Sequence, residues 1–189
     1  MRSDHQLMEA VAQGDEAAFR ELVERHQRPV YGTILKMLGD PHEAEDLAQR
    51  VFLRVYQAAP RYRPDAQFST WLYTILRRLV FNESERRNRS RHRFLSQTQL
   101  AGEEGEIWDS PDTRQQDPAA ALADRERQER VDAAVRDLPE NQRLAVLLQT
   151  HQDLSYEEIA SILKTSVSAT KSILFRARET LRKSLQKEL

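Results

Sequence analysis

Basic side chains in one segment near the C-terminus are the residues of this chain that most clearly suggest a chemistry. The polar members of this segment are Lys171, Ser172, Arg176 and Arg178. Apolar residues separate them at near-helical spacing, at Val167, Ile173, Leu174, Ala177 and Leu181. A helix of this kind buries its apolar side and presents its basic side to phosphates or to base edges in a DNA groove. The segment therefore predicts a helix that contacts nucleic acid.

A shorter helix is predicted directly before this basic helix. Ser155 and Glu158 have the spacing of a capping box, which satisfies free backbone N–H groups where a helix begins. The apolar stripe of this helix consists of Ile159, Ala160, Ile162 and Leu163. Two short helices joined by a tight turn, with a basic second helix, are typical of a helix-turn-helix that places its second helix in a major groove. An ordinary amphipathic hairpin with a solvated basic face would show the same pattern.

Catalytic chemistry has no comparable support. The chain contains no cysteine, which excludes disulfides, thiolate zinc sites and cysteine nucleophiles. The histidines, which show no metal-ligand or base–nucleophile spacing, are His5, His26, His42, His92 and His151. Acidic residues follow His42, but they suit a helix start, where the helix dipole favours negative charge. Because a phosphate-cradling glycine loop is also missing from the sequence, we expect no enzyme, no cofactor and no bound metal.

Charge is segregated along the chain, although the formal net charge is only −1. Basic clusters at 86–93 and 171–187 flank an acidic run from Glu103 to Asp117. Separate basic patches meet phosphate whatever the net charge is. The arginines at 86–93 have little nearby compensation in the sequence and favour phosphate contact, although a frayed, solvated helix end would look the same.

The sequence also predicts where the protein resides. No stretch approaches the roughly 18 consecutive apolar residues of a membrane span. The first residues lack the apolar core of a signal peptide. We therefore expect a soluble, cytoplasmic protein with no membrane insertion of its own.

Helical patterns cover both ends of the chain and predict an all-α fold with two small domains. Gly14 and Gly39 are expected to end the first two helices, and Asp40 followed by a proline is a typical helix start. A loop is expected at 61–67, and Ser69 or Thr70 is expected to cap a long helix after it. These signals predict helical domains at 1–95 and 118–189. The flexible acidic linker that joins them is predicted at 96–117.

Several segments, taken in their order, resemble the extracytoplasmic-function group of bacterial sigma factors. In the first half these segments are DLAQRVFLRVY at 46–56 and FSTWLYTI at 68–75. In the second half they are LPE at 138–140, LSYEEIA at 154–160 and FRARE at 175–179. The resemblance implies sigma domain 2 at 1–95 and sigma domain 4 at 118–189. It further implies a protein that binds core RNA polymerase, reads −10 and −35 promoter elements and helps to open the DNA.

By position, the segment 46–56 is similar to the helix that docks on the polymerase clamp. The residues that the resemblance assigns to polymerase binding are Asp46, Leu47, Gln49, Val51, Phe52 and Tyr56. Asp46 and Gln49 are favoured because their polar groups need a partner, whereas Val51 and Phe52 would equally suit plain core packing. Arg50 departs from the acidic residue that is common in the family at this position, which puts Arg50 in doubt as a contact.

The loop after this helix and the helix that follows resemble the part that captures a base from the −10 element. An unstacked base needs an aromatic or planar surface beside backbone donors. The loop candidates are Tyr62, Arg63, Asp65, Ala66, Gln67 and Phe68. The helix candidates are Trp71, Arg77, Arg78, Phe81 and Asn82. Trp71 would also suit core packing.

The helix-turn-helix resembles the part that reads the −35 element. The residues assigned to this role are Lys171, Ser172, Phe175, Arg176 and Arg178 on the second helix. Three more begin the supporting helix, near backbone phosphates: Ser155, Tyr156 and Glu157. Two positions depart from the family, which frequently has glycine at Ser168 and arginine at Ile173. Because a possible guanine or phosphate contact is lost at Ile173, we expect an unusual −35 sequence.

The resemblance also concerns the linker and a further partner. In the family the linker threads polymerase channels. The acidic residues here suit that role or a plain tether, and Ile107 and Trp108 favour a docked segment. Family members are usually held by an anti-sigma protein, so such a partner is implied. The competing class is a conventional helix-turn-helix regulator, which needs no polymerase-docking helix and binds symmetric operator DNA as a dimer.

Overall fold

The computed structural model describes residues 2–95, 118–152 and 154–186, and these residues form helices and connecting turns. The first group of helices is α1 (Asp4–Ala12), α2 (Glu16–Leu38), α3 (Pro41–Ala58), the 3-10 turn η1 (Ala59–Arg61) and α4 (Phe68–Leu95). The second group is α5 (Pro118–Arg136), α6 (Glu140–Gln152), α7 (Tyr156–Leu163) and α8 (Val167–Gln186). The described residues contain no strand, and the all-α prediction is confirmed.

Local signals place most helix ends where the sequence predicts them. Asp15 caps α2, and Gly39 ends it in the left-handed region at φ 73°. Asp40 caps α3, with a proline in its first turn. Ser155 and Glu158 form the predicted capping box of α7, in which each side chain bonds the other residue's backbone N–H.

The predicted start of the long helix is wrong. α4 already begins at Phe68, so Ser69 and Thr70 lie inside its first turn rather than at its cap. Phe68 is buried in the core, which draws the start of the helix forward. The buried Thr70 has a different partner, because its hydroxyl donates to Glu158 of α7 at 3.2 Å.

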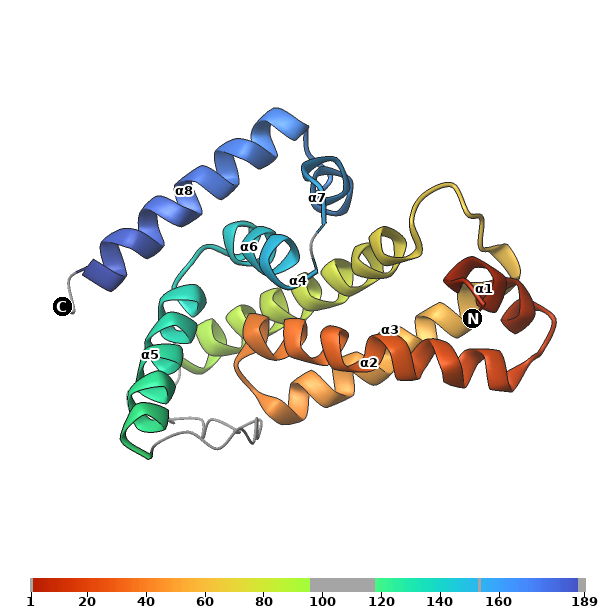
Figure 1. The fold of residues 1–189 in the computed structure, drawn as a ribbon, viewed down its shortest axis with the longest axis horizontal. Coiled ribbons are helices and arrows are strands. Elements are labelled where there is room, and N and C mark those ends of the chain that lie inside the picture. Colours follow the sequence, from red (N-terminus) through yellow and green to blue (C-terminus); the bar gives the residue numbers. More distant parts are fainter. Residues whose placement is uncertain (1, 96–117, 153, 187–189) are drawn as a thin grey trace.

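The helices α1 to α4 form one packed unit, in which α2 lies against both α1 and α3, and α4 packs on α3 (Figure 1). Its largest fully buried side chains come from every helix of the unit: Leu7, Met8, Leu22, Ile34, Leu47, Leu72 and Leu76. Burial of such side chains is the main stabilising contribution, at roughly 1.5–3 kcal/mol each. This core fixes the positions of the outward-facing residues on α3 and α4.

The helices α5 to α8 form the second unit, in which α6 and α7 both pack against α8. Its core includes Leu144, Leu147, Leu148, Ile159, Ile162 and Leu174. The tight turn between α7 and α8 is the one predicted, and Lys164 adopts the left-handed conformation there, at φ 56°. The turn orients α8 with its basic side outward.

The two units pack directly on each other, with α4 against α7 and α2 against α5 and α6 (Figure 1). One continuous apolar cluster runs through both units. Polar contacts reinforce it: Arg143 of α6 donates to the Met37 carbonyl of α2 at 2.6 Å, and the Ser84 hydroxyl of α4 donates to Glu140 of α6. This packing is a closed arrangement of the two units.

Candidate polymerase and nucleic-acid interfaces

The helix α3 divides its predicted polymerase contacts between the core and the surface. Leu47, Val51 and Phe52 are buried and support the helix from inside. Asp46, Gln49 and Tyr56 are exposed. Direct contact of these three residues with polymerase stays a prediction. Their burial in the core already explains why they are apolar.

A further exposed residue on this helix escaped the sequence reasoning. Leu53 leaves 54% of its surface in solvent, and Tyr56, one helical turn away, leaves 45%. Tyr56 also packs edge-on against Phe19 of α2, at 5.0 Å between ring centroids. We define the outward stripe of α3 as Asp46, Gln49, Leu53 and Tyr56. The signal that could have found Leu53 is its place outside the buried stripe of the helix.

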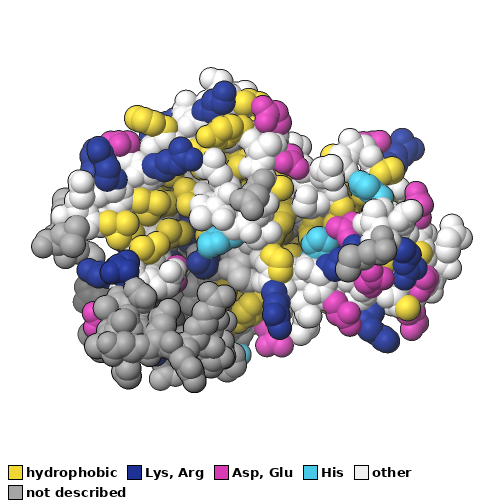
Figure 2. All heavy atoms as spheres, in the orientation of Figure 1, with side chains coloured by type: hydrophobic (Ala, Val, Ile, Leu, Met, Phe, Trp, Pro, Cys, Tyr) yellow, Lys and Arg dark blue, Asp and Glu magenta, His cyan; other side chains and the backbone are white. Residues whose placement is uncertain are grey.

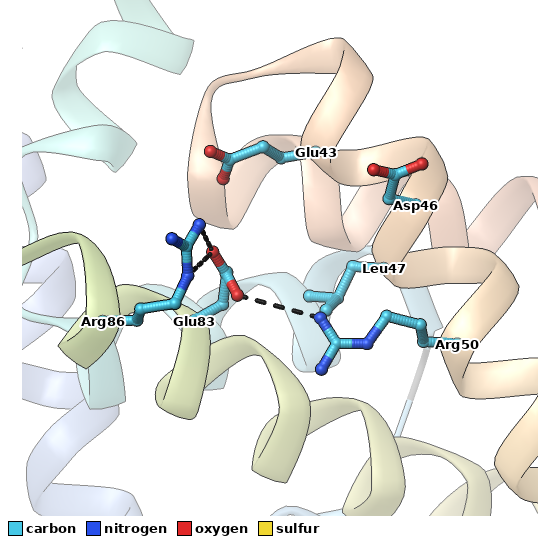
Figure 3. Close-up of a pocket in the computed structure, with 6 residues that line it drawn as sticks. All are labelled: Glu43, Asp46, Leu47, Arg50, Glu83 and Arg86. Carbon is cyan, nitrogen blue, oxygen red and sulfur yellow. Dashed lines mark hydrogen bonds and ion pairs between the residues drawn. The ribbon is translucent and has the colours of Figure 1, made fainter.

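A charged hollow lies between α3 and α4 (Figure 3). Its lining residues are Glu43, Asp46, Leu47, Arg50, Glu83 and Arg86. Glu83 stands between two arginines, accepting a hydrogen bond from Arg86 Nε at 2.8 Å and lying 3.8 Å from Arg50 Nη1. The Arg86 hydrogen bond is the main cause that lowers the pKa of Glu83. Arg50, the family departure, thus has an ion-pair partner on the neighbouring helix.

The arginine cluster at the end of α4 is better compensated than the sequence indicates. Arg86 pairs with Glu83, and Arg87 pairs with Glu43 and donates to the Leu38 carbonyl at 2.8 Å. The prediction that these two arginines lack compensation is therefore wrong, because their acidic partners are distant in sequence or one helical turn away. Arg89 is exposed, and the side chains at 91–93 lie outside the described part of the chain.

Aromatic rings predicted to serve the −10 element do come together. Tyr62 packs edge-on against Trp71, with 4.9 Å between centroids, and against Phe68 at 6.3 Å. Phe68 and Trp71 lie 5.8 Å apart. Phe68 is buried, so it supports the other two rings from beneath. Tyr62 and Trp71 are half-buried, and both functions proposed for Trp71, packing and contact, fit its position.

The rest of the predicted −10 surface is divided between two sides of α4 and the preceding loop. The exposed loop residues are Arg63, Asp65, Ala66 and Gln67. Arg78 and Asn82 are exposed and share one side of α4 with Trp71, since they follow it by about two and three helical turns. This side is open to a ligand in the closed arrangement.

Arg77 and Phe81 lie on another side of α4. Thr70 and Ser84 both bond to the second unit and stand about four helical turns apart, so residues 77 and 81 share their side. Both are half-buried, and the Arg77 guanidinium lies 4.8 Å from the Phe81 ring centroid. Burial lowers the pKa of Arg77, and its Nε has no hydrogen-bond partner among the described residues. These two predicted DNA contacts thus lie on the side of α4 that faces the second unit.

The second helix of the helix-turn-helix presents its predicted residues together. Lys171, Ser172, Phe175, Arg176 and Arg178 are all exposed, as are Ser155 and Glu157 at the start of α7. Phe175 is the most exposed large apolar residue described, at 67%. Basic side chains lie among apolar ones in the region of α8 (Figure 2).

Neighbouring residues orient this surface without neutralising it. The Lys171 ammonium lies 5.7 Å from the Tyr156 ring centroid, and Arg178 donates to the Gln149 amide oxygen at 2.7 Å. Arg176 donates only to the Ser172 carbonyl of its own helix among the contacts that the described residues make. These cations therefore remain available for phosphates or base edges.

The described residues provide neither a metal site nor a membrane-spanning helix. In these ranges no group of three or more histidine, aspartate or glutamate side chains could hold a metal ion. None of the described helices is long and apolar enough to span a bilayer.

Comparison with known proteins identifies the family. The Sigma-70 region 2 family matches residues 22–90, and the Sigma-70 region 4 family matches residues 128–181. RNA polymerase sigma-H factor of Pseudomonas aeruginosa is 34% identical over 185 residues, which cover 97% of this chain and 94% of the relative. ECF RNA polymerase sigma factor SigW of Bacillus subtilis is 32% identical, covering 93% of both chains.

A solved structure shares the fold. The sigma factor RpoE of Bartonella quintana, solved in complex with the anti-sigma factor NepR, superposes with a TM-score of 0.67 at 22% identity, covering 89% of this chain and 96% of that one. The relatives are sigma factors, which are not enzymes. On the ordered match of both regions and the identity to curated relatives, the chain belongs to the extracytoplasmic-function group of RNA polymerase sigma factors.

Proposed function

We propose that this sigma factor docks on core RNA polymerase through the outward stripe of α3 and reads promoters with two separate surfaces. The −10 surface comprises the loop at 62–67 and the reading sides of α4, and the −35 surface comprises the exposed side of α8. The observation that carries the proposal is the pair of large apolar residues in the stripe, Leu53 and Tyr56, exposed beside two polar ones. Neighbouring large apolar residues exposed on the outer side of a helix are typical of protein interaction sites.

The domain boundaries belong to the same proposal. We assign domain 2 to residues 1–95, the linker to 96–117 and domain 4 to 118–189. The two family matches lie within these limits, at 22–90 and 128–181. The helix α1 extends domain 2 beyond its family match, because Leu7, Met8 and Val11 complete the same core. The linker lies outside the described residues, so its docking in polymerase stays a prediction.

Reading of the −10 element requires a change in the closed arrangement. Arg77 and Phe81 can reach a DNA strand only after domain 4 leaves α4. The side of α4 that carries Trp71, Arg78 and Asn82 is free without any such movement. Docking on polymerase therefore separates the two domains and completes the −10 surface.

An anti-sigma protein is the expected regulatory partner. The sigma factor RpoE of Bartonella quintana, which shares the fold, was solved with its anti-sigma factor NepR, and this supports such a partner here. A protein that covers the outward stripe of α3 would prevent docking. The conventional regulator, the competing class, receives no support from the relatives, which are named as sigma factors.

The proposed docking surface is tested with core polymerase and a library of random promoters. The chain is expected to direct promoter-specific RNA synthesis. Asp46→Arg combined with Gln49→Ala should weaken association with core polymerase while helical content stays unchanged, because both side chains are exposed. The matched control is Glu24→Arg, an equal charge change at an exposed position of α2. Equal loss in the control, or a collapse of helical content in the double variant, would overturn the assignment of the stripe.

A further inference from the structure

His5 occupies an unexpected place beside the −10 surface. It lies on α1, before the residues that match the Sigma-70 region 2 family. The position of α1 is fixed from two sides: Ser3 and Gln6 form a capping box at its start, and its apolar residues are buried in the domain 2 core. Because the helix is anchored in this way, a contact made by His5 has a defined geometry.

The imidazole of His5 contacts one residue of the aromatic group. Its Nδ1 lies 2.5 Å from the Tyr62 hydroxyl oxygen, and the two rings stack with 5.9 Å between centroids and 25° between planes. Burial, followed by the charges of Asp4, Asp65 and Glu9, raises the pKa of Tyr62 to about 12. The phenol therefore keeps its proton and can donate it to Nδ1 of the neutral imidazole whose other nitrogen carries the hydrogen.

The neighbouring residue of α1 holds the same group from the other end. The Asp4 carboxylate lies 2.8 Å from His26 Nε2 and 2.7 Å from Arg25 Nη1. His26 in turn packs against Phe68, with 5.1 Å between centroids. Two consecutive residues of α1 thus fix the rings at both ends, since Phe68 and Tyr62 each pack on Trp71.

We infer that His5 is a positioning residue for −10 base capture, which holds Tyr62 in the orientation that receives an unstacked base. This inference rests on the proposed role of Tyr62 in the −10 surface. Tyr62 is held by a hydrogen bond and a stacked ring from His5, in addition to its edge-on contacts with Trp71 and Phe68. A tyrosine held in this way loses little rotational freedom when a base arrives, because that freedom was already lost on folding. Removal of the hydrogen bond leaves the ring present but less ordered, which slows capture without abolishing it.

The experiment measures the rate of strand opening by holoenzyme on duplex promoter and on a template whose −10 region is already mismatched. His5→Phe keeps a ring and removes the imidazole nitrogen that bonds Tyr62, and Tyr62→Phe keeps the ring and removes the hydroxyl. Each should slow opening of duplex DNA roughly fivefold, the effect of one hydrogen bond. The double variant should be no slower than either single variant, because both remove the same bond.

A rescue variant and two controls separate positioning from general stability. His5→Asn returns an acceptor and should restore much of the opening rate. Core polymerase binding and the helical content of His5→Phe should match those of the unaltered chain. On the mismatched template the defects should shrink, since the unpairing step has been removed.

The outcomes distinguish the two proposals. Normal opening by Tyr62→Ala would overturn the role of Tyr62 and the role of His5 with it. Slow opening by Tyr62→Ala together with normal opening by His5→Phe would overturn only the role of His5. Additive defects in the double variant, or a failure of His5→Asn to restore any activity while Tyr62→Phe is slow, would also overturn it.

Discussion

The two helices that are proposed to read DNA, α4 and α8, differ in how far their reading sides are exposed in the free chain. The reading side of α8 is exposed throughout, and its cations Lys171 and Arg176 have no acidic partner among the described residues. The corresponding region of α4 faces domain 4 on one side, and two arginines toward its far end, Arg86 and Arg87, are paired with acids. On the proposed function, the DNA-reading surface of domain 4 is already exposed in the free chain, whereas that of domain 2 is completed only when the domains separate.

This difference has a physical reason. A helix that inserts into duplex DNA needs only exposed side chains, because the duplex presents its groove edges already formed. A surface that holds unstacked bases needs aromatic rings, and exposed rings in a free protein favour unwanted association. Partial burial of Phe81 and full burial of Phe68 reduce that exposure on α4 in the free chain.

The largest expected effect on promoter binding lies on the exposed side of α8. Arg176→Ala should cost about 1–3 kcal/mol at promoters with a −35 element if the arginine contacts a base, and the preference at one position should relax. If it contacts a phosphate, all sequences should weaken alike and the salt dependence should become less steep. Affinity and salt titrations of holoenzyme check this. A mismatched −10 template that restores the Arg176 variant, but leaves a Tyr62 variant unchanged, would show that the two domains are assigned the wrong way round.

The paired arginines of α4 should behave differently. Arg87→Ala removes the contact with Glu43 and the hydrogen bond to the Leu38 carbonyl. Hydrogen bonds to charged groups contribute about 1.5–3 kcal/mol, so the free energy of unfolding should fall by an amount of that order. Chemical denaturation measures it. If the free energy of unfolding is unchanged and the salt dependence of promoter binding falls instead, Arg87 contacts DNA as the cations of α8 are proposed to do, and the contrast between the two helices is wrong.

A smaller effect is expected at the covered side of α4. Thr70→Val keeps the shape of the side chain and removes the hydrogen bond to Glu158. The closed arrangement should weaken by roughly 1 kcal/mol, and the population with separated domains should rise. Hydrogen exchange in α4 and α7 would report this as faster exchange in both helices. Unchanged exchange in both would mean that the bond does not hold the domains together.

The smallest effect concerns acid stability in the charged hollow. Since Arg86 lowers the pKa of Glu83 in the folded chain, the charged carboxylate stabilises the fold above its ordinary value of 4.5, and this contribution is lost as the pH falls through the lowered pKa. Glu83→Gln should therefore be less stable than the unaltered chain at neutral pH, and the difference should narrow below pH 4.5. Denaturation at several pH values checks this. If the difference in the free energy of unfolding between the two proteins does not change with pH, the ion pair of Glu83 is not its cause.

Sequence reasoning succeeded where the signal is local. The Ser155 capping box, the stop at Gly39 and the spacing of the basic helix each depend on residues within a few positions, and the structure has all three. The aromatic group was also foreseen in part, because Tyr62, Phe68 and Trp71 are close in sequence.

Contacts between distant segments were not foreseen. The pairing of Arg87 with Glu43, the closure of Thr70 on Glu158 and the approach of His5 to Tyr62 join residues on different helices. The periodicity of a segment shows which side of its helix is apolar. It does not show which other helix that side packs against. The start of α4 was misplaced for the same reason, because burial of Phe68 outweighed the capping preference of Ser69.

The central claim is that domain 4 covers part of the −10 surface in the free chain and leaves it in the holoenzyme. Because the chain has no cysteine, two cysteines can be introduced for spectroscopic labels without competing thiols, at the exposed positions Glu24 of α2 and Ser161 of α7, which lie outside the outward stripe of α3 and the proposed DNA-reading residues. The distance between the labels should be narrowly distributed in the free chain, and should lengthen when core polymerase binds. An equal distance in both states, or a broad distribution in the free chain, would contradict the account.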